Sequence, residues 1–276
     1  MTAAAAPQPR ALIVSVYGMY ARALGGWMSV SSIIELMAEL GVDEMAVRSS
    51  ISRLKRRGIL VADRIGGVAG YGLSVSAGVI LEEGDRRIFQ RRRATAGDGW
   101  VLAVFSVPET ERFRRHQLRS RLAGLGFGTV AAGVWIAPAH VYEEARETLE
   151  RLDLASYVDL FRADHLAFAG SDVRIGAWWD LDRLRLLYQN FLDAHSRVQA
   201  SYRRGRKVDD RQAFAHFIPA LTDWRRLPYA EPGLPSDLLP PQWIGLRAAD
   251  LFFDLYDRLA APAQRFVMRR LAPEDQ

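Results

Sequence analysis

Hydrophobic and polar positions follow a helical period most clearly between residues 44 and 57. The apolar residues Val47, Ile51 and Leu54 recur there at spacings of four and three, so we expect them to share one buried face of a helix. Asp43 is placed to cap the start of this helix, and the basic residues gather in its last turn, as the helix dipole favours. The pattern predicts an amphipathic helix over Glu44–Arg57.

The polar face of this helix combines arginines with small hydroxyl side chains, a set that can read base edges in a major groove. We expect four residues to contact bases and three basic residues to contact phosphates. The base candidates are Arg48, Ser49, Ser52 and Arg53, and the phosphate candidates are Arg56, Arg57 and Arg64. A solvated face on an ordinary helix is the alternative interpretation. For Arg48, a structural role that ties the helix to its neighbour is a further alternative.

The elements expected on either side give the order helix, helix, turn, helix and two-stranded wing, which is that of a winged helix-turn-helix. Ser31 or Ser32 is expected to open the second helix, and the wing tip is expected to be glycine-rich and flexible. The predicted helices are Arg10–Leu24 and Ile33–Leu40, the strands are Ile59–Ala62 and Tyr71–Val75, and the tip is Arg64–Gly70. A helix over Val75–Gln90 follows, and its basic run to Arg93 is expected either to touch phosphates or to be a solvated linker.

The middle of the chain alternates strand-like and helix-like patterns in the ferredoxin-like order βαββαβ. The expected strands are 100–107, 127–130, 133–137 and one or two within 157–168, and the expected helices are 109–125 and 141–152. Some ferredoxin-like nucleases carry an aspartate at the end of the first strand. The corresponding residues here are Ser106-Val107-Pro108, so the pattern argues against a nuclease.

The last third is predicted to be mainly helical. Five of the fourteen residues from 228 to 241 are proline, which cannot continue a helix and predicts an extended strap. The expected helices are Leu181–Tyr202, Asp209–Leu221, Leu246–Leu259 and Ala263–Arg270. His195 lies on the apolar face of the first of these, where a satisfied core histidine is favoured over a ligand. The fold class predicted for the whole chain is α+β, with domains at 10–93, 98–170 and 171–276.

Composition narrows the classes of function. The chain has no cysteine, which excludes disulfides and thiolate metal sites. Of the net charge of +5, residues 1–95 carry an excess of +5 (13 Lys and Arg against 8 Asp and Glu), as expected where phosphates are contacted. No signal peptide or run of about 18–20 apolar residues is evident, so we expect a cytoplasmic protein without a membrane partner. The five histidines show no metal-ligand spacing, and neither an enzyme nor a cofactor is expected.

The chain resembles the PaaX family, repressors of phenylacetic acid degradation genes, over nearly its whole length. The residues that carry the resemblance are 46–58, 105–109 with 125–128 and 133–138, and 227–243, of which the last, proline-rich set is the most specific. The resemblance implies a winged helix of the GntR type, a central ferredoxin-like domain and a carboxy-terminal helical domain. It also implies a homodimer on partly palindromic operator DNA, released by an aryl-coenzyme A thioester such as phenylacetyl-CoA.

An acyl-CoA effector needs cations for its phosphates and an apolar slot for its aryl group. The candidate effector residues are Trp178, Trp179, Tyr202, Arg203, Trp224, Arg225 and Tyr229, with Arg204, Arg206 and Arg226 nearby. The alternative is that these aromatics belong to the core and these arginines to the surface. For the whole chain, the alternatives are a regulator of another pathway with another effector, an architectural DNA binder without an effector, and an acyl-CoA-acting enzyme.

Overall fold

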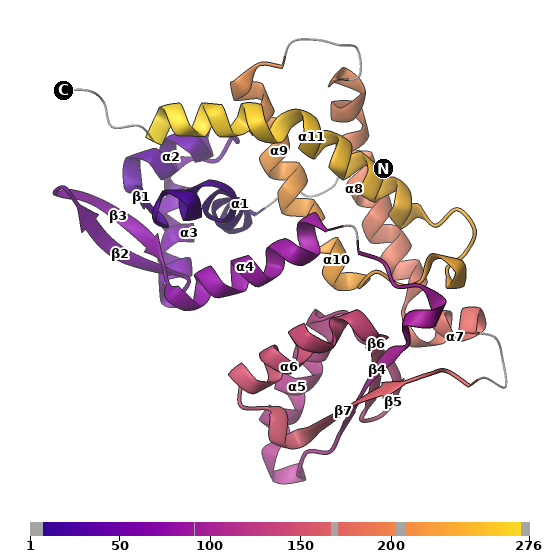
Figure 1. Ribbon diagram of the computed structural model, residues 1–276. Helices are drawn as coiled ribbons and strands as arrows, with labels where there is room; N and C mark the ends of the chain where they lie inside the picture. The colour runs from indigo at the N-terminus through magenta and orange to yellow at the C-terminus, as the bar shows by residue number, and fades with distance from the viewer. Residues whose placement is uncertain (1–7, 91, 167–170, 203–207, 272–276) are drawn as a thin grey trace. The chain divides into compact units, whose positions relative to one another are not determined.

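The structure, a computed structural model, describes residues 8–90, 92–166, 171–202 and 208–271 (Figure 1). It contains helices and two antiparallel sheets, which confirms the predicted α+β class. Two compact units are present, and the last third of the chain contributes to both of them. The first comprises Met1–Arg86, Asn190–Trp224 and Ala248–Gln276, and the second comprises Arg87–Gln189 and Arg225–Arg247.

Helical segments near the amino terminus form the base of the first unit. Helix α1, Pro9–Val16, continues into a π-helical turn at Tyr17–Ala21 and a 3-10 turn at Arg22–Leu24, in place of one uniform helix. Helix α2, Val30–Ala38, starts earlier than predicted because Ser29, rather than Ser31 or Ser32, is its cap. The Ser29 hydroxyl accepts a hydrogen bond from the Ser32 amide at 3.0 Å, which satisfies one free donor of the first turn.

Helix α3, Glu44–Arg56, is followed by two of the three strands of a small sheet. Strands β2, Leu60–Ile65, and β3, Val68–Leu73, form a long hairpin, and β1, Trp27–Ser29, pairs with the other edge of β3. The predicted seven-residue tip is therefore wrong: both strands extend to a tight turn at Gly66 and Gly67, where positive φ angles of 58° and 81° are suited to glycine.

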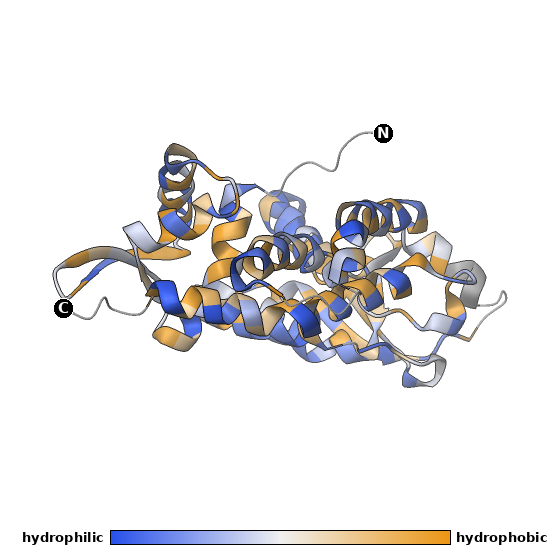
Figure 2. Ribbon diagram, turned by 90° about the horizontal axis from the view of Figure 1, so that it is seen from above, coloured by the Kyte–Doolittle hydropathy of each residue, from blue (hydrophilic) through white to orange (hydrophobic). Residues whose placement is uncertain are grey.

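Four helices from later in the chain contribute to the first unit. Helix α9, Asp210–Trp224, lies wholly in it. Helix α4, Val75–Phe89, contributes up to Arg86, α8, Leu181–Tyr202, contributes from Asn190, and α11, Ile244–Leu271, contributes from Ala248. Figure 2 shows that hydrophobic and hydrophilic residues are interspersed along the helices of the chain. The break predicted near Pro262 is wrong, because α11 continues through this proline. The buried side chains of Leu259, Ala263 and Phe266 hold the helix on both sides of it.

The DNA-binding candidate region packs directly on these later helices within the first unit. The Ser15 and Thr222 hydroxyls are hydrogen-bonded at 2.7 Å in a buried position. At the surface, Arg211 of α9 forms an ion pair with Glu39, and Arg270 of α11 lies 3.4 Å from the Glu35 carboxylate of α2. Helices α1 and α2 are therefore fastened to the carboxy-terminal helices.

The second unit is built on a four-stranded antiparallel sheet of order β5-β6-β4-β7. Helices α5, Arg112–Gly124, and α6, Tyr142–Arg151, cover one of its faces. The buried side chains Leu118, Leu122 and Leu149 pack from these helices against the sheet. The strands are β4, Trp100–Phe105, β5, Gly128–Ala131, β6, Val134–Pro138, and β7, Val158–Ala163.

The proline-rich segment of the second unit is only partly extended, so the predicted strap needs correction. Helix α10, Leu227–Ala230, accepts Pro228 in its first turn, where no amide donor is required. A 3-10 turn at Ser236–Leu238 follows. Helix α7, Ser171–Trp178, precedes α8 and was not predicted.

A buried carboxylate holds this segment in place. The Glu231 side chain is fully buried, and its Oε2 accepts hydrogen bonds from Tyr188 Oη at 2.9 Å and from Trp243 Nε1 at 3.1 Å. Arg93 Nη2 lies 2.9 Å from the same oxygen, and the Leu234 amide donates to Glu231 Oε1 at 3.1 Å. One ionised group therefore joins four otherwise separate parts of the second unit.

Two arginines of the basic run that begins in α4 are neither free for phosphates nor part of a solvated linker. Arg93 pairs with Glu231, as described above. Arg87 Nε lies 2.6 Å from Glu144 Oε2, and its Nη1 donates to the Leu125 carbonyl at 2.8 Å. Its guanidinium also stacks over the Tyr229 ring at 4.9 Å. These two arginines are structural.

Candidate nucleic-acid interface

Helix α3 is fixed in the first unit by its apolar side. Val47 and Leu54 are fully buried and Ile51 is nearly so, as their spacing predicted. Asp43 Oδ1 accepts a hydrogen bond from the Ala46 amide at 2.9 Å, which confirms the predicted cap. Because one side is anchored in this way, the opposite side of α3 faces solvent.

All the predicted DNA-contact residues are exposed. The structure places Arg48, Ser49, Ser52, Arg53 and Arg56 on α3, Arg57 at its end and Arg64 on β2. Within the described ranges, no carboxylate pairs with the guanidinium groups of Arg53, Arg56 or Arg57. These groups therefore remain available to phosphate or base oxygens.

Arg48 differs from its neighbours because it has a partner on its own helix. Its Nε lies 2.7 Å from Glu44 Oε1, and both side chains are more than half exposed. An exposed pair at this spacing stabilises a helix by only about 0.2–0.5 kcal/mol, so a DNA contact can replace it at little cost. No tie from Arg48 to a neighbouring helix appears among the described residues.

The β2–β3 hairpin extends away from α1–α3 (Figure 1). Arg64 lies on β2 rather than in a flexible loop, and its Nη1 donates to the Gly67 carbonyl at 3.1 Å, which directs the side chain toward the tip. Val61, Ile65 and Val68 are about half exposed. Sequence reasoning missed these three apolar residues because apolar residues in a strand are ordinarily expected to be buried.

Gly70 fixes the position of the hairpin on the first unit. A Cβ atom at this position would lie 2.3 Å from the Trp27 ring and 2.4 Å from the Met28 carbonyl oxygen. Glycine therefore allows β1 to pair closely with β3. The hairpin and α3 are consequently held by the same small sheet.

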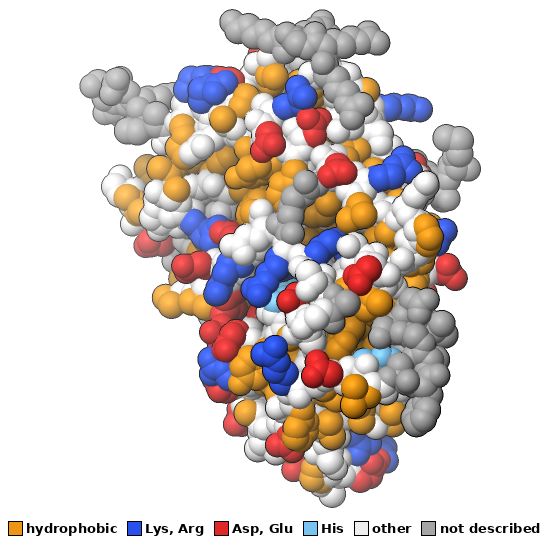
Figure 3. Space-filling model, turned by 45° about the vertical axis from the view of Figure 1, so that its right-hand side comes forward, with side chains coloured by type: hydrophobic (Ala, Val, Ile, Leu, Met, Phe, Trp, Pro, Cys, Tyr) orange, Lys and Arg blue, Asp and Glu red, His pale blue; other side chains and the backbone are white. Residues whose placement is uncertain are grey.

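The molecular face in Figure 3 carries basic, acidic and apolar side chains interspersed with one another. No broad surface of a single charge is visible on this face. In α3, by contrast, the last turn contains Arg53, Lys55 and Arg56, and its one acidic residue, Glu44, lies in the first turn. Positive charge is thus concentrated at the carboxy-terminal end of this helix.

Four of the candidate effector residues lie in the second unit. Trp179 is buried, and its Nε1 donates to the Gly126 carbonyl at 2.9 Å, while Trp178 and Trp179 form edge contacts with each other at 6.2 Å. Burial lowers the pKa of Arg225, and the neighbouring Arg226 lowers it further. Tyr229 lies under the Arg87 guanidinium.

The tryptophan pair also lines an open depression of about 500 Å³. Asp180 and Asp182 are its only charged lining residues, and no described Lys or Arg side chain lines it. Two carboxylates without a cation are poorly suited to the phosphates of an acyl-CoA.

Two other candidates lie in the first unit and make core contacts. Trp224 stacks on Phe252 with ring centroids 4.8 Å apart and an interplanar angle of 11°. Tyr202 Oη is hydrogen-bonded to His216 Nδ1 at 2.8 Å, and burial, with a contribution from Asp209, raises the pKa of Tyr202. The candidates thus belong to two separate units. Arg203, with Arg204 and Arg206, lies outside the described residues.

His195 is a buried core residue, as the sequence indicated. Its Nε2 lies 3.0 Å from Asp223 Oδ2, and its ring contacts Phe191 at 4.9 Å. Within the described part of the chain, no group of three or more metal-ligating side chains is suited to hold an ion. No described helix is both long and apolar enough to cross a lipid bilayer.

Comparisons with known proteins match nearly the whole chain. Residues 8–77, 93–173 and 179–269 match the family models described as PaaX-like protein, PaaX protein central Cas2-like domain and PaaX-like protein C-terminal domain. The chain is 25% identical over 263 residues to the transcriptional repressor PaaX of Escherichia coli (strain K12), covering 94% of this chain and 83% of that protein. An uncharacterized protein from Mycobacterium tuberculosis has the same overall fold, with a TM-score of 0.54, 22% identity, and coverage of 91% of this chain and 99% of that one.

Proposed function

Because the chain belongs to the PaaX family of transcriptional repressors, we propose that its amino-terminal part is a winged helix-turn-helix that binds operator DNA. The element order α1, β1, α2, α3, β2, β3 is that of this motif. One observation carries the proposal: Arg53 and Arg56 of α3, with Arg57 at its end, are exposed and have no carboxylate partner among the described residues, and they lie beside a projecting hairpin.

In this proposal α3 enters the major groove. Arg48, Ser49, Ser52 and Arg53 contact base edges, and Arg56, Arg57 and Arg64 contact phosphates. Arginine is suited to the first role because it can donate two parallel hydrogen bonds to guanine. A homodimer would place two copies of α3 in successive major grooves, about 34–36 Å apart, on a partly palindromic site.

We further propose that an aryl-CoA thioester, typified by phenylacetyl-CoA, releases the repressor from a phenylacetate-type catabolic operon. Release requires a ligand that binds more tightly to a form with low operator affinity. The fastening of α2 to α9 and α11 supports such coupling, since these helices belong to the same unit. The strand order of the second unit supports a ferredoxin-like central domain. A regulator of another pathway with another effector is the alternative.

We predict that Arg53→Ala and Arg57→Ala impair DNA binding in different ways. Loss of a base contact at Arg53 should cost about 1–3 kcal/mol on the operator and relax the preference at one base pair. Loss of a phosphate contact at Arg57 should weaken binding to all sequences and reduce the salt dependence by about one ion. Fluorescence anisotropy on operator and random duplexes, over a range of salt concentrations, measures both effects. Equal losses on both duplexes for both variants would refute these roles.

The function itself is tested by binding the full chain to the DNA upstream of its own gene at fixed salt. The complex is then titrated with phenylacetyl-CoA, other acyl-CoA thioesters and free coenzyme A. Release by one thioester and not by free coenzyme A is the expected result. Specific binding that no thioester disturbs would refute the proposed effector but keep the DNA-binding function. Lack of specific binding to this DNA would refute the proposed function as a whole.

A further inference from the structure

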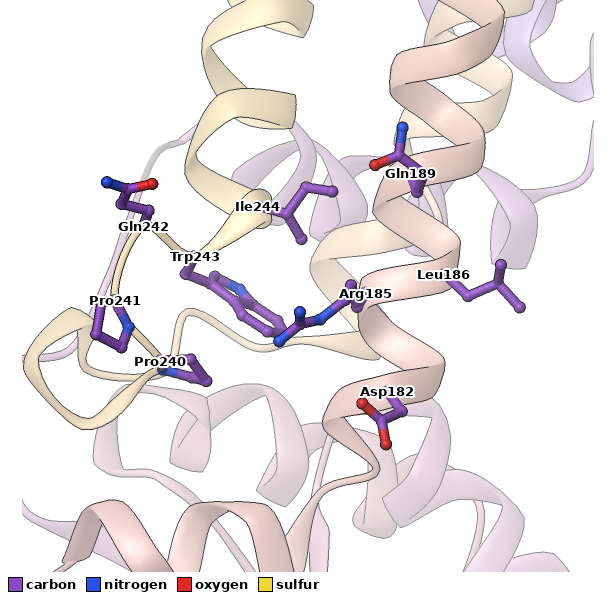
Figure 4. Close-up of a pocket in the computed structure, with 9 residues that line it drawn as sticks. All are labelled: Asp182, Arg185, Leu186, Gln189, Pro240, Pro241, Gln242, Trp243 and Ile244. Atoms are coloured by element: carbon purple, nitrogen blue, oxygen red, sulfur yellow. The ribbon is translucent and has the colours of Figure 1, made fainter.

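A pocket of about 400 Å³ lies in the second unit, between α8 and the segment that leads into α11 (Figure 4). We propose that it binds an organic anion that carries an aryl group, and that Arg185 holds the acidic group. The assignment rests on the proposed function, because it would locate the effector site of the repressor. The lining residues are Asp182, Arg185, Leu186, Gln189, Pro240, Pro241, Gln242, Trp243 and Ile244.

One wall of the pocket is fixed before any ligand arrives. Trp243 donates to the buried Glu231 carboxylate, and Tyr188 donates to the same oxygen and contacts the Trp243 ring edge-on at 6.2 Å. A Cβ atom at Gly245 would lie 2.7 Å from Trp243 Nε1, so the chain packs closely around the indole. Trp243 is only 3% exposed, so it closes this side of the pocket as a packed side chain that need not be reordered when a ligand binds.

The cation of the pocket is Arg185. Its side chain extends from α8 toward the Pro240–Ile244 segment (Figure 4), and no described carboxylate forms an ion pair with it. A guanidinium binds carboxylates and phosphates through paired hydrogen bonds. The pocket also borders the first turn of α11, where amide groups add partial positive charge. Both features favour a negatively charged ligand at this end.

Polar groups at the rim of the pocket can orient a bound ligand. Gln242 offers an amide donor and acceptor, whereas the Asp182 carboxylate lies on α8, on the opposite side of the pocket in Figure 4. Gln242 has a φ of 56°, and Asp153 is the only other non-glycine residue with positive φ in the described chain. A non-glycine residue in this conformation is strained, and such residues are concentrated at functional and ligand-binding sites.

The chemistry of the walls defines the class of ligand. The half-buried Pro240 and the exposed Pro241 and Leu186 provide apolar surface, and Arg185 provides the charge. The volume is within the range of small-molecule sites and suits an aryl acid or one end of a thioester. The acidic group is either a free carboxylate or a phosphate of coenzyme A, which the test distinguishes. None of the candidate effector residues from the sequence lines this pocket.

Isothermal titration calorimetry of the full chain with phenylacetyl-CoA, phenylacetate and free coenzyme A tests the site. Arg185→Gln should weaken binding of the recognised compound by about tenfold or more, because it removes a charged hydrogen-bond donor. Arg183→Gln is the matched control, since Arg183 is exposed on the same helix and does not line the pocket. The affinity of this variant for the compound should stay within about twofold of the wild-type value. Asp182→Asn should strengthen binding, because it removes a repelling charge.

The three compounds separate the two sources of the anion. Binding of phenylacetate would identify a carboxylate, and binding of free coenzyme A would identify a phosphate. If the wild type and Arg185→Gln bind a compound with equal affinity, the proposed role of the pocket is refuted. It is also refuted if none of the three compounds binds to the wild type. Circular dichroism of each variant confirms that it is folded.

An operator-binding measurement on the same samples separates this inference from the proposed function. If phenylacetyl-CoA releases both wild type and Arg185→Gln equally, the effector function stands and this pocket is refuted. If the wild type binds the ligand through Arg185 but does not bind operator, the pocket stands and the proposed function fails.

Discussion

Replacing Glu231 by alanine is expected to lower the free energy of unfolding by about 3–5 kcal/mol. The substitution leaves the Arg93 guanidinium, which is only 26% exposed, without its counter-ion. It also leaves the buried Tyr188 hydroxyl and Trp243 indole N–H without an acceptor. Each buried group that loses its partner keeps its desolvation cost but loses the compensating interaction. Urea denaturation followed by tryptophan fluorescence measures the change.

Two further variants separate charge from hydrogen bonding at this position. Glu231→Gln keeps a carbonyl acceptor but removes the charge, so its loss of stability should be intermediate. Asp237→Ala removes an exposed carboxylate from the same proline-rich segment and should change the free energy by no more than about 0.5 kcal/mol. Equal stabilities of Glu231→Ala and Asp237→Ala would show that the buried network contributes nothing.

Leu54→Ala is expected to destabilise the first unit by about 2–5 kcal/mol. Leu54 is fully buried on the inner face of α3, and truncation leaves a cavity beneath the helix. Operator affinity should fall as well, because displacement of α3 moves the exposed arginines. Thermal unfolding by circular dichroism and anisotropy on the operator measure the two consequences.

Arg53→Ala is the matched control on the same helix. Arg53 is exposed, so its removal should leave the unfolding temperature unchanged while reducing operator affinity. The two faces of α3 thereby give different patterns: Leu54→Ala loses both stability and operator binding, whereas Arg53→Ala loses operator binding alone. Unaltered stability of Leu54→Ala would contradict the packing described for α3.

The sequence predicts α3 well because its evidence is local. The spacing of Val47, Ile51 and Leu54 defines the buried face, and Asp43 and Gly58 stand at the two ends. The start of α2 was missed because Ser29, Ser31 and Ser32 are chemically equivalent capping candidates. Ser29 becomes the cap only through the tertiary structure, in which it ends strand β1 and directly precedes α2.

Contacts between segments that are distant in the sequence cannot be predicted from local periodicity. Ser15 and Thr222 are 207 residues apart, and no periodicity in the sequence relates them. The same limit applies to the candidate effector residues, which are neighbours in sequence but are divided between the two units. The predicted break between Leu259 and Ala263 was wrong for a related reason, since buried neighbours in the fold outweigh the missing amide donor of Pro262.

The pocket at Arg185 shows a third limit. The proline-rich run was recognised as distinctive, but it was expected to form a strap rather than the wall of a cavity. The signals present in the sequence were Trp243 beside two prolines and a cation on the facing helix. Their proximity depends on the Glu231 network, which joins residues from four segments.

The attachment of α1 and α2 to α9 and α11 also bears on how such repressors can diversify. A DNA-binding domain that is joined to the rest of its chain only by a linker can be exchanged between proteins by recombination at a single point. Here exchange would break the Ser15–Thr222 contact and the ion pairs of Glu35 and Glu39 at the same time. New operator preferences should therefore arise by point substitution on the exposed face of α3, while the proposed DNA-binding domain and the carboxy-terminal helices are inherited together.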